Sequence, residues 1–119
     1  MCVDAGFNRS LLSHCIRFGT CPDNPGYLNR YLNACEQDAH GSTDSYAREV
    51  YEEAVFLLLD TAADETIAPH WRRLCLDHIH RPLRGLRRLR VTKQHQHDFN
   101  QVIYMLNTRV AQTFAHTSD

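Results

Sequence analysis

The stretch from Ser45 to Ala63 reads SYAREVYEEAVFLLLDTAA and carries the strongest structural signal in the sequence. Placed on a helix, its apolar side chains fill an arc of roughly 160°, and Phe56 and Leu59 extend beyond that arc. The charged side chains occupy the remainder of the circumference. A helix that is apolar over so wide an arc cannot lie at the rim of a small monomer. The pattern therefore predicts that helix 45–63 is central to the fold or packs against a second copy of the chain.

Helical patterns continue on both sides of this segment, over about 4–17, about 25–36, from Pro69 onward, and over about 83–90. Pro82 is expected to break or sharply bend the chain before the last of these. A further stripe over about 98–114 predicts a long amphipathic C-terminal helix. No stretch alternates with the period of two that is typical of a half-buried strand. We predict a single all-α domain over residues 1–119, a compact bundle of five or six helices with a wide-faced central helix.

The length and composition favour a cytoplasmic protein. The 119 residues suit one domain, and no apolar run approaches the roughly 18–20 residues that a membrane helix needs. No basic stretch followed by an apolar block marks a signal peptide. The 5 cysteines are odd in number and form no CxxC motif, which argues against a disulfide framework. We expect Cys15, Cys35 and Cys75 to be reduced thiols on apolar helix faces.

The net charge of −1 conceals a separation of charge along the chain. Residues 1–66 carry 4 basic and 11 acidic side chains, whereas residues 67–119 carry 9 basic and 3 acidic side chains. Such a dipolar arrangement favours self-association or an acidic protein partner over a polyanion. The sequence pI of about 6.7 is also lower than the value of ~9 that many nucleic-acid-binding domains exceed.

Residues 72–93 form a basic segment that contains one acid, Asp77. Arginine is suited to bidentate pairing with carboxylate or phosphate, so this segment has two alternative uses. One is pairing with the acidic face of helix 45–63, within the chain or across a dimer. The other is nucleic-acid binding, although the aromatic residues that stack on bases are missing from the strip. The nucleic-acid alternative uses Arg81, Arg84, Arg87, Arg88, Arg90 and Lys93.

A metal- or redox-responsive site is a third alternative. Cys75 and His78 share a helix face at i and i+3, and His95 and His97 point the same way if their segment is extended. Zinc requires three or four ligands in closed geometry, and nothing in this spacing enforces it. We therefore expect no metal and no other cofactor.

Enzymatic motifs are missing from the sequence. It contains no GxSxG, no glycine-rich phosphate loop and no HExxH. Glu49 and Glu53 are four residues apart, but they fall on the polar arc of helix 45–63, where a solvated face is the expected role. We therefore expect a protein without enzymatic activity.

The sequence favours a small regulatory protein that binds another protein stoichiometrically as a homodimer. An adaptor or anti-activator that masks a surface of a transcription factor or enzyme is the concrete form of this hypothesis. Apolar side chains would supply contact energy, and arginines would steer an acidic partner. The predicted partner-binding residues are Phe56, Leu59, Trp71, Arg84, Arg87, Arg88, Tyr104 and Met105.

Overall fold

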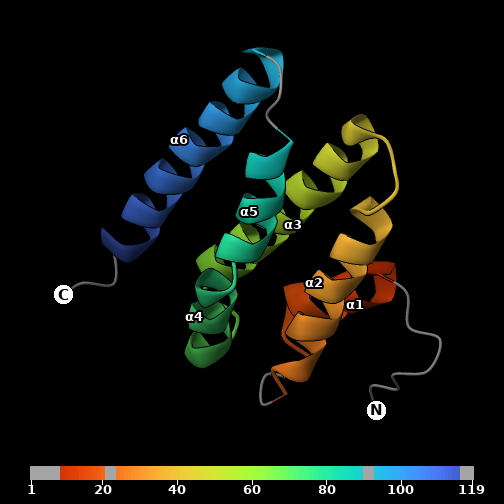
Figure 1. Cartoon of the computed structure of the whole chain (residues 1–119). Helices are drawn as coiled ribbons and strands as arrows, with labels where there is room; N and C mark the ends of the chain where they lie inside the picture. The colour runs from red at the N-terminus through yellow and green to blue at the C-terminus, as the bar shows by residue number, and fades with distance from the viewer. Residues whose placement is uncertain (1–8, 21–23, 90–92, 116–119) are drawn as a thin grey trace.

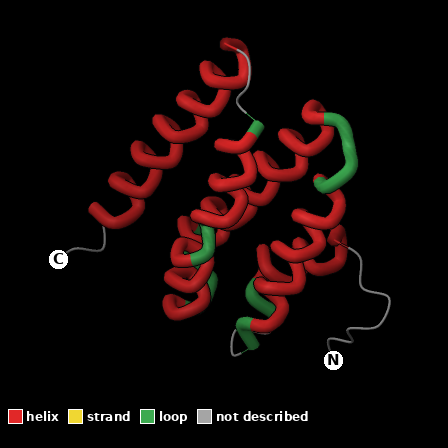
Figure 2. The backbone as a smooth tube through the Cα atoms, in the orientation of Figure 1, coloured by secondary structure: helices red, strands yellow, loops and turns green. Residues whose placement is uncertain are grey.

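A computed structural model describes residues 9–20, 24–89 and 93–115 of the protein, and within these residues it contains six helices and no strand (Figure 2). The prediction of an all-α protein with five or six helices is therefore confirmed. In chain order the helices are α1 (Arg9–Phe18), α2 (Gly26–Ala39), α3 (Asp44–Ala63), α4 (Pro69–Asp77), α5 (His80–Arg88) and α6 (Lys93–Ala115).

Helix α3 is the centre of the arrangement, because α1, α2, α4, α5 and α6 all pack against it. Its side chains Ala54, Val55 and Leu58 are completely buried. The helix begins after Thr43, whose side chain accepts a hydrogen bond from the backbone N–H of Tyr46 at 3.2 Å. Such an N-cap satisfies one of the backbone donors that a helix start leaves without a partner. The central position that the wide apolar arc predicts is confirmed.

Two groups of buried side chains hold the helices on α3. The first joins α1, α2, α3 and α4 around Trp71, whose indole Nε1–H donates a hydrogen bond to the backbone oxygen of Ile16 at 2.9 Å. The second joins α3, α5 and α6 through Val55, Leu86, Phe99 and Val102. Helices α5 and α6 therefore depend on a smaller core than the N-terminal helices do.

The molecule is thin, with a Cα trace of 41 × 39 × 15 Å. A depth of 15 Å corresponds to about two helix layers whose axes lie 8–10 Å apart. Figure 1 shows α6 at one edge and α1 and α2 at the opposite edge, with α3, α4 and α5 between them. In so thin a molecule, each outer helix keeps a broad side that no other helix covers.

The structure corrects the position of one predicted break. The chain turns at His78 and Ile79, between α4 and α5, and Pro82 lies in the first turn of α5. Backbone N–H groups in a first helical turn have no acceptor within the helix. Proline, which has no N–H, therefore costs no helical hydrogen bond at this position. The helix predicted over about 83–90 therefore begins at His80 and ends at Arg88.

The other predicted boundaries differ by a few residues. The described part of α1 begins at Arg9, and the predicted start near residue 4 lies outside the described residues. Helix α6 begins at Lys93 instead of near residue 98. Helix α2 continues to Ala39, three residues beyond its predicted end at about 36. It ends two residues before Gly41, which has a φ of 80°. A positive φ is readily adopted by glycine, and it redirects the chain toward α3.

Candidate functional site

Four arginine side chains of the described residues each form an ion pair with a carboxylate from another helix or loop. The pairs are Arg9 with Asp38 (2.8 Å), Arg17 with Asp64 (2.7 Å), Arg81 with Glu36 (3.0 Å) and Arg109 with Asp60 (2.7 Å). By contrast, the three arginines Arg84, Arg87 and Arg88 of α5 are exposed and form no ion pair in the described part of the chain. They are the cations that α5 presents to solvent.

Within one chain, the described arginines of the basic segment form no ion pair with the acidic face of α3. Glu53 and Asp60 of α3 form ion pairs with Arg9 and Arg109, which lie outside the basic segment. Arg81 instead reaches α2. Helix α5 packs on α3 and also contacts α2, which brings Arg81 to Glu36.

Gly85 brings α5 unusually close to α3. A Cβ atom at position 85 would lie 2.5 Å from Cζ of Tyr51, closer than real Cβ contacts are. Glycine in a helix interior makes the helix less stable than alanine does, by roughly 1 kcal/mol. Its presence at position 85 is explained by the Tyr51 ring, which occupies the space that a side chain would need. The contact fixes the phenol end of Tyr51 against the backbone of α5, between the positions of Arg84 and Arg88.

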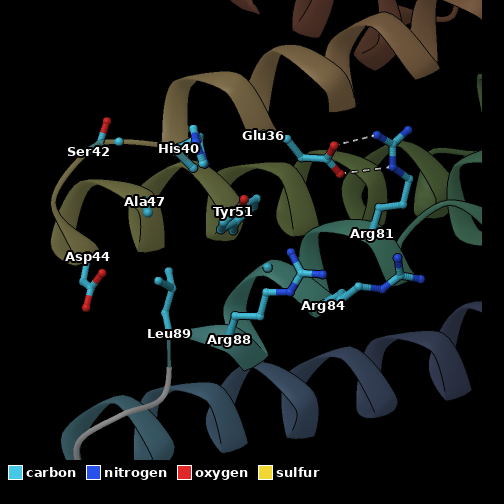
Figure 3. Close-up of a pocket in the computed structure, with 13 residues that line it drawn as sticks. Glu36, His40, Ser42, Asp44, Ala47, Tyr51, Arg81, Arg84, Arg88 and Leu89 are labelled. Atoms are coloured by element: carbon cyan, nitrogen blue, oxygen red, sulfur yellow. Dashed lines mark hydrogen bonds and ion pairs between the residues drawn. The ribbon is translucent and has the colours of Figure 1, made fainter.

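A cleft of about 470 Å³ opens beside this contact (Figure 3). One wall is α5, with Arg84 and Arg88, and the other is formed by the C-terminal end of α2 and the start of α3, with Glu36 and Asp44. Tyr51 lies between the two walls (Figure 3). The cleft is therefore polar, with cations concentrated on one side.

The Tyr51 hydroxyl is protonated at neutral pH, because its pKa lies above the ordinary value of 10.0. Burial of the ring raises the pKa of Tyr51, the negative charge of Glu36 raises it further, and Arg88 acts in the opposite direction. The Tyr51 hydroxyl has no hydrogen-bond partner among the described residues. It is therefore a free neutral donor at the cleft. The arrangement of this donor beside two guanidinium groups is suited to binding an anion.

The apolar residues predicted to bind a partner divide into two sets. Tyr104 and Met105 are 72 % and 44 % exposed, and Phe56 is half-buried. Leu59 and Trp71 are each only 1 % exposed, so their prediction as surface contacts is wrong. Leu59 is covered because helices pack around almost the whole of α3, beyond the arc that the sequence pattern defines. Trp71 is covered because its indole is anchored to Ile16 within the core.

The described members of the predicted metal site do not form a metal-binding cluster. Cys75 is completely buried, and burial raises the pKa of its thiol to about 12, so the thiolate that binds metal is disfavoured. Nδ1 of His78 lies 2.9 Å from the backbone oxygen of Leu74. His97 is exposed on α6, and the side chain of His95 lies outside the described residues. In the part of the chain that the structure describes, no group of three or more His, Cys, Asp or Glu side chains could hold a metal ion.

The predicted nucleic-acid strip is interrupted. Arg81 is held by Glu36 and also donates to Asn33 Oδ1 at 2.8 Å. Arg90 and the Lys93 side chain lie outside the described residues. Of the six predicted residues, Arg84, Arg87 and Arg88 are thus placed on an open surface.

Sequence reasoning missed Gly85, Tyr51 and Glu36 as members of the site. A glycine between Arg84 and Leu86 in a helical pattern is a signal of close packing, and it could have located the contact with α3. No sequence signal pairs Glu36 with Arg81, because these residues are 45 positions apart and meet only in the folded chain.

No helix of the described residues is both long and apolar enough to span a membrane. Comparison with known proteins gives no relative, since no protein-family model, curated protein or solved structure matches this chain. Function therefore has to be inferred from the arrangement of the chain's own residues.

Proposed function

We propose that this chain is a small non-enzymatic regulatory protein that acts in the cytoplasm by stoichiometric protein–protein binding. Its main binding surface is the exposed side of α5, and its partner presents an acidic surface. Acting as an adaptor or anti-activator, the protein masks that surface on a transcription factor or an enzyme.

The observation that carries the proposal is the contrast between occupied and free arginines. Arg9, Arg17, Arg81 and Arg109 already hold a carboxylate, whereas the three exposed arginines of α5 have none in the described part of the chain. A free guanidinium can form a bidentate contact with a partner carboxylate without breaking an internal one. Three of them within nine helical residues create a local positive potential that steers an acidic partner.

We also propose that the protein is a homodimer that associates through the outer face of α6. Tyr104 and Met105 are exposed there, and Met105 lines a shallow pocket together with Phe56. From Phe99 to Ala115 the sequence contains one charged residue, Arg109, and it is paired with Asp60. In an isologous dimer the same patch meets itself, so a face with apolar groups and no free charge avoids repulsion between like charges.

The binding surface is tested by a calorimetric titration of polyglutamate into the full chain at low ionic strength. We expect the triple variant R84Q/R87Q/R88Q to bind about tenfold more weakly, because each exposed ion pair contributes roughly 0.2–1 kcal/mol. The matched control is Arg73→Gln, which removes an exposed arginine of α4 and should leave the affinity unchanged. Equal affinities of the triple variant and the wild type would contradict the proposal.

The dimer is tested by sedimentation equilibrium. Wild-type protein should sediment as a dimer and the variant Y104E/M105E as a monomer, because four carboxylates would then meet at the interface. Phe18→Glu serves as the control, since Phe18 of α1 is 56 % exposed and lies outside the proposed interface. A monomeric wild type, or a dimer that persists in Y104E/M105E, would exclude this interface.

Nucleic acid is the competing partner class for the same arginines. Random duplex DNA titrated in parallel distinguishes the two, because binding driven by phosphate contacts weakens steeply as salt increases. Tighter binding to the duplex than to polyglutamate, lost in R84Q/R87Q/R88Q, would assign the α5 surface to nucleic acid instead.

A further inference from the structure

The cleft between α5, α2 and α3 presents its hydrogen-bond donors and positive charges at one end. Arg84 and Arg88 are four residues apart, which places them on the same side of α5, and both line the cleft. Arg87 differs from them, because its guanidinium carbon lies 6.0 Å from the ring centroid of Phe99, toward α6. Two of the three free arginines therefore belong to the cleft.

The Tyr51 hydroxyl adds a third donor to this end of the cleft. The ring cannot retreat toward α5, because Gly85 is already in contact with Cζ and leaves no room for even a Cβ atom. The hydroxyl has no internal hydrogen bond in the described part of the chain, and the protonated phenol donates. A hydroxyl without a partner in the protein can donate to a ligand oxygen without breaking an internal hydrogen bond.

The two carboxylates of the cleft do not cancel this positive end. Glu36 is paired with Arg81, with Oε1 lying 3.0 Å from one guanidinium nitrogen, although its negative charge still raises the pKa of Tyr51. Figure 3 shows Glu36 turned toward Arg81. Asp44 is seven residues before Tyr51 on α3, a separation of about 10 Å along the helix axis. The cleft thus holds three guanidinium groups, those of Arg81, Arg84 and Arg88, against the two carboxylates of Glu36 and Asp44.

From this geometry we infer that the cleft is an anion-binding site, which takes one oxyanion group at the Arg88 guanidinium and the Tyr51 hydroxyl, with Arg84 on the same wall of the cleft. The inference rests on the proposed function and deepens it, because it names the group that is recognised, a carboxylate of the acidic partner. Inorganic phosphate offers the same kind of oxygen acceptors. The two sources of the oxyanion are separated by experiment.

The experiment follows the backbone amide signals of the full-length protein by NMR during titration with two probes. The first probe is N-acetylglutamate α-amide, which carries one side-chain carboxylate, and the second is inorganic phosphate. We expect saturable shifts at Tyr51, Gly85 and Arg88 with the carboxylate probe. Stronger binding of phosphate at the same amides would assign the site to a phosphoryl group and overturn the carboxylate assignment.

Tyr51→Phe is the decisive variant, because it removes the hydroxyl and leaves the ring against Gly85. We expect its affinity for the carboxylate probe to fall about tenfold, as for loss of a hydrogen bond to a charged group. Arg88→Gln should weaken binding to a similar extent, and Arg73→Gln, outside the cleft, should have no effect. Affinity that is unchanged in Tyr51→Phe, or shifts that are spread over other helices, would overturn the inference.

The outcomes also separate this inference from the proposed function. If polyglutamate binding depends on the α5 arginines but is the same in Tyr51→Phe and wild type, the cleft inference is wrong and the α5 surface stands. If the small carboxylate binds in the cleft and polyglutamate does not bind at all, the anion site stands and the protein-binding function is wrong. If neither small probe binds and polyglutamate does not bind either, the cleft inference and the proposed protein-binding function are both wrong.

Discussion

Gly85 of α5 lies directly against the phenol ring of Tyr51 of α3, with room for no side-chain atom between them. This contact determines how closely α5 approaches the central helix, and Tyr51 lines one cleft with Arg84 and Arg88, which have no carboxylate partner in the described part of the chain. Gly85 therefore has two effects: it allows the close packing of α5 on α3, and it holds Tyr51 at the wall of the cleft.

Gly85→Ala should destabilise the fold despite the higher helix propensity of alanine. Alanine gains up to about 1 kcal/mol in a helix, whereas forcing an extra atom into a tight contact costs roughly 1–3 kcal/mol. We expect a net loss in the free energy of unfolding, measured by urea denaturation. In a Tyr51→Ala background the same substitution should become stabilising, because the ring no longer occupies the space. If Gly85→Ala instead stabilises the otherwise wild-type protein, the contact between Gly85 and Tyr51 is loose.

Leu59→Ala should destabilise the protein strongly, whereas Met105→Ala should not. Leu59 is 1 % exposed and Met105 is 44 % exposed, although both fall off the main apolar stripe of their helices. Truncating a buried leucine costs roughly 2–5 kcal/mol, while most surface substitutions change stability by no more than about 0.5 kcal/mol. Chemical denaturation of the two variants measures the difference. Equal losses would contradict the burial of Leu59.

Alkaline pH should destabilise the fold through its buried thiols. Burial raises the pKa of Cys35 to about 11 and of Cys75 to about 12, from an ordinary value of 9.0. Above pH 9 the unfolded chain loses these protons while the folded chain keeps them, so stability present below that pH decreases as the pH rises. Each thiol contributes a slope of at most roughly 1.4 kcal/mol per pH unit.

Burial also raises the pKa of Tyr31, which adds to this decrease above its ordinary value of 10.0. The free energy of unfolding of the wild type and of Cys75→Ala, measured across the alkaline range, checks the prediction. The variant should lose stability less steeply above pH 9. Parallel curves would show that Cys75 titrates alike in the folded and unfolded chains.

The sequence predicted the helical class and the central position of α3 because periodicity and the width of an apolar arc are local properties. It failed at Leu59 and Trp71 because burial depends on which helices surround a position. The apolar arc correctly located the main buried face of α3. Neighbouring helices also cover side chains outside this arc, such as Leu59. The break expected at Pro82 was misplaced because proline is tolerated in a first helical turn, and sequence alone did not locate that turn.

The candidate site was predicted in part. The arginines of α5 were identified from their charge, but which of them remain free depends on contacts between distant segments, such as Arg81 with Glu36. The cleft itself arises from the approach of α5 to Tyr51, which a glycine in a helical pattern suggests but does not locate.

The central claim is that the free arginines of α5 form the binding surface. NMR chemical-shift mapping of polyglutamate on the full-length protein at low ionic strength tests it most directly. The largest perturbations should fall on Arg84, Arg87, Arg88 and the adjoining Tyr51, and they should disappear as salt is added. Perturbations centred on Arg73 of α4 or on Tyr104 of α6, with α5 unchanged, would contradict the claim.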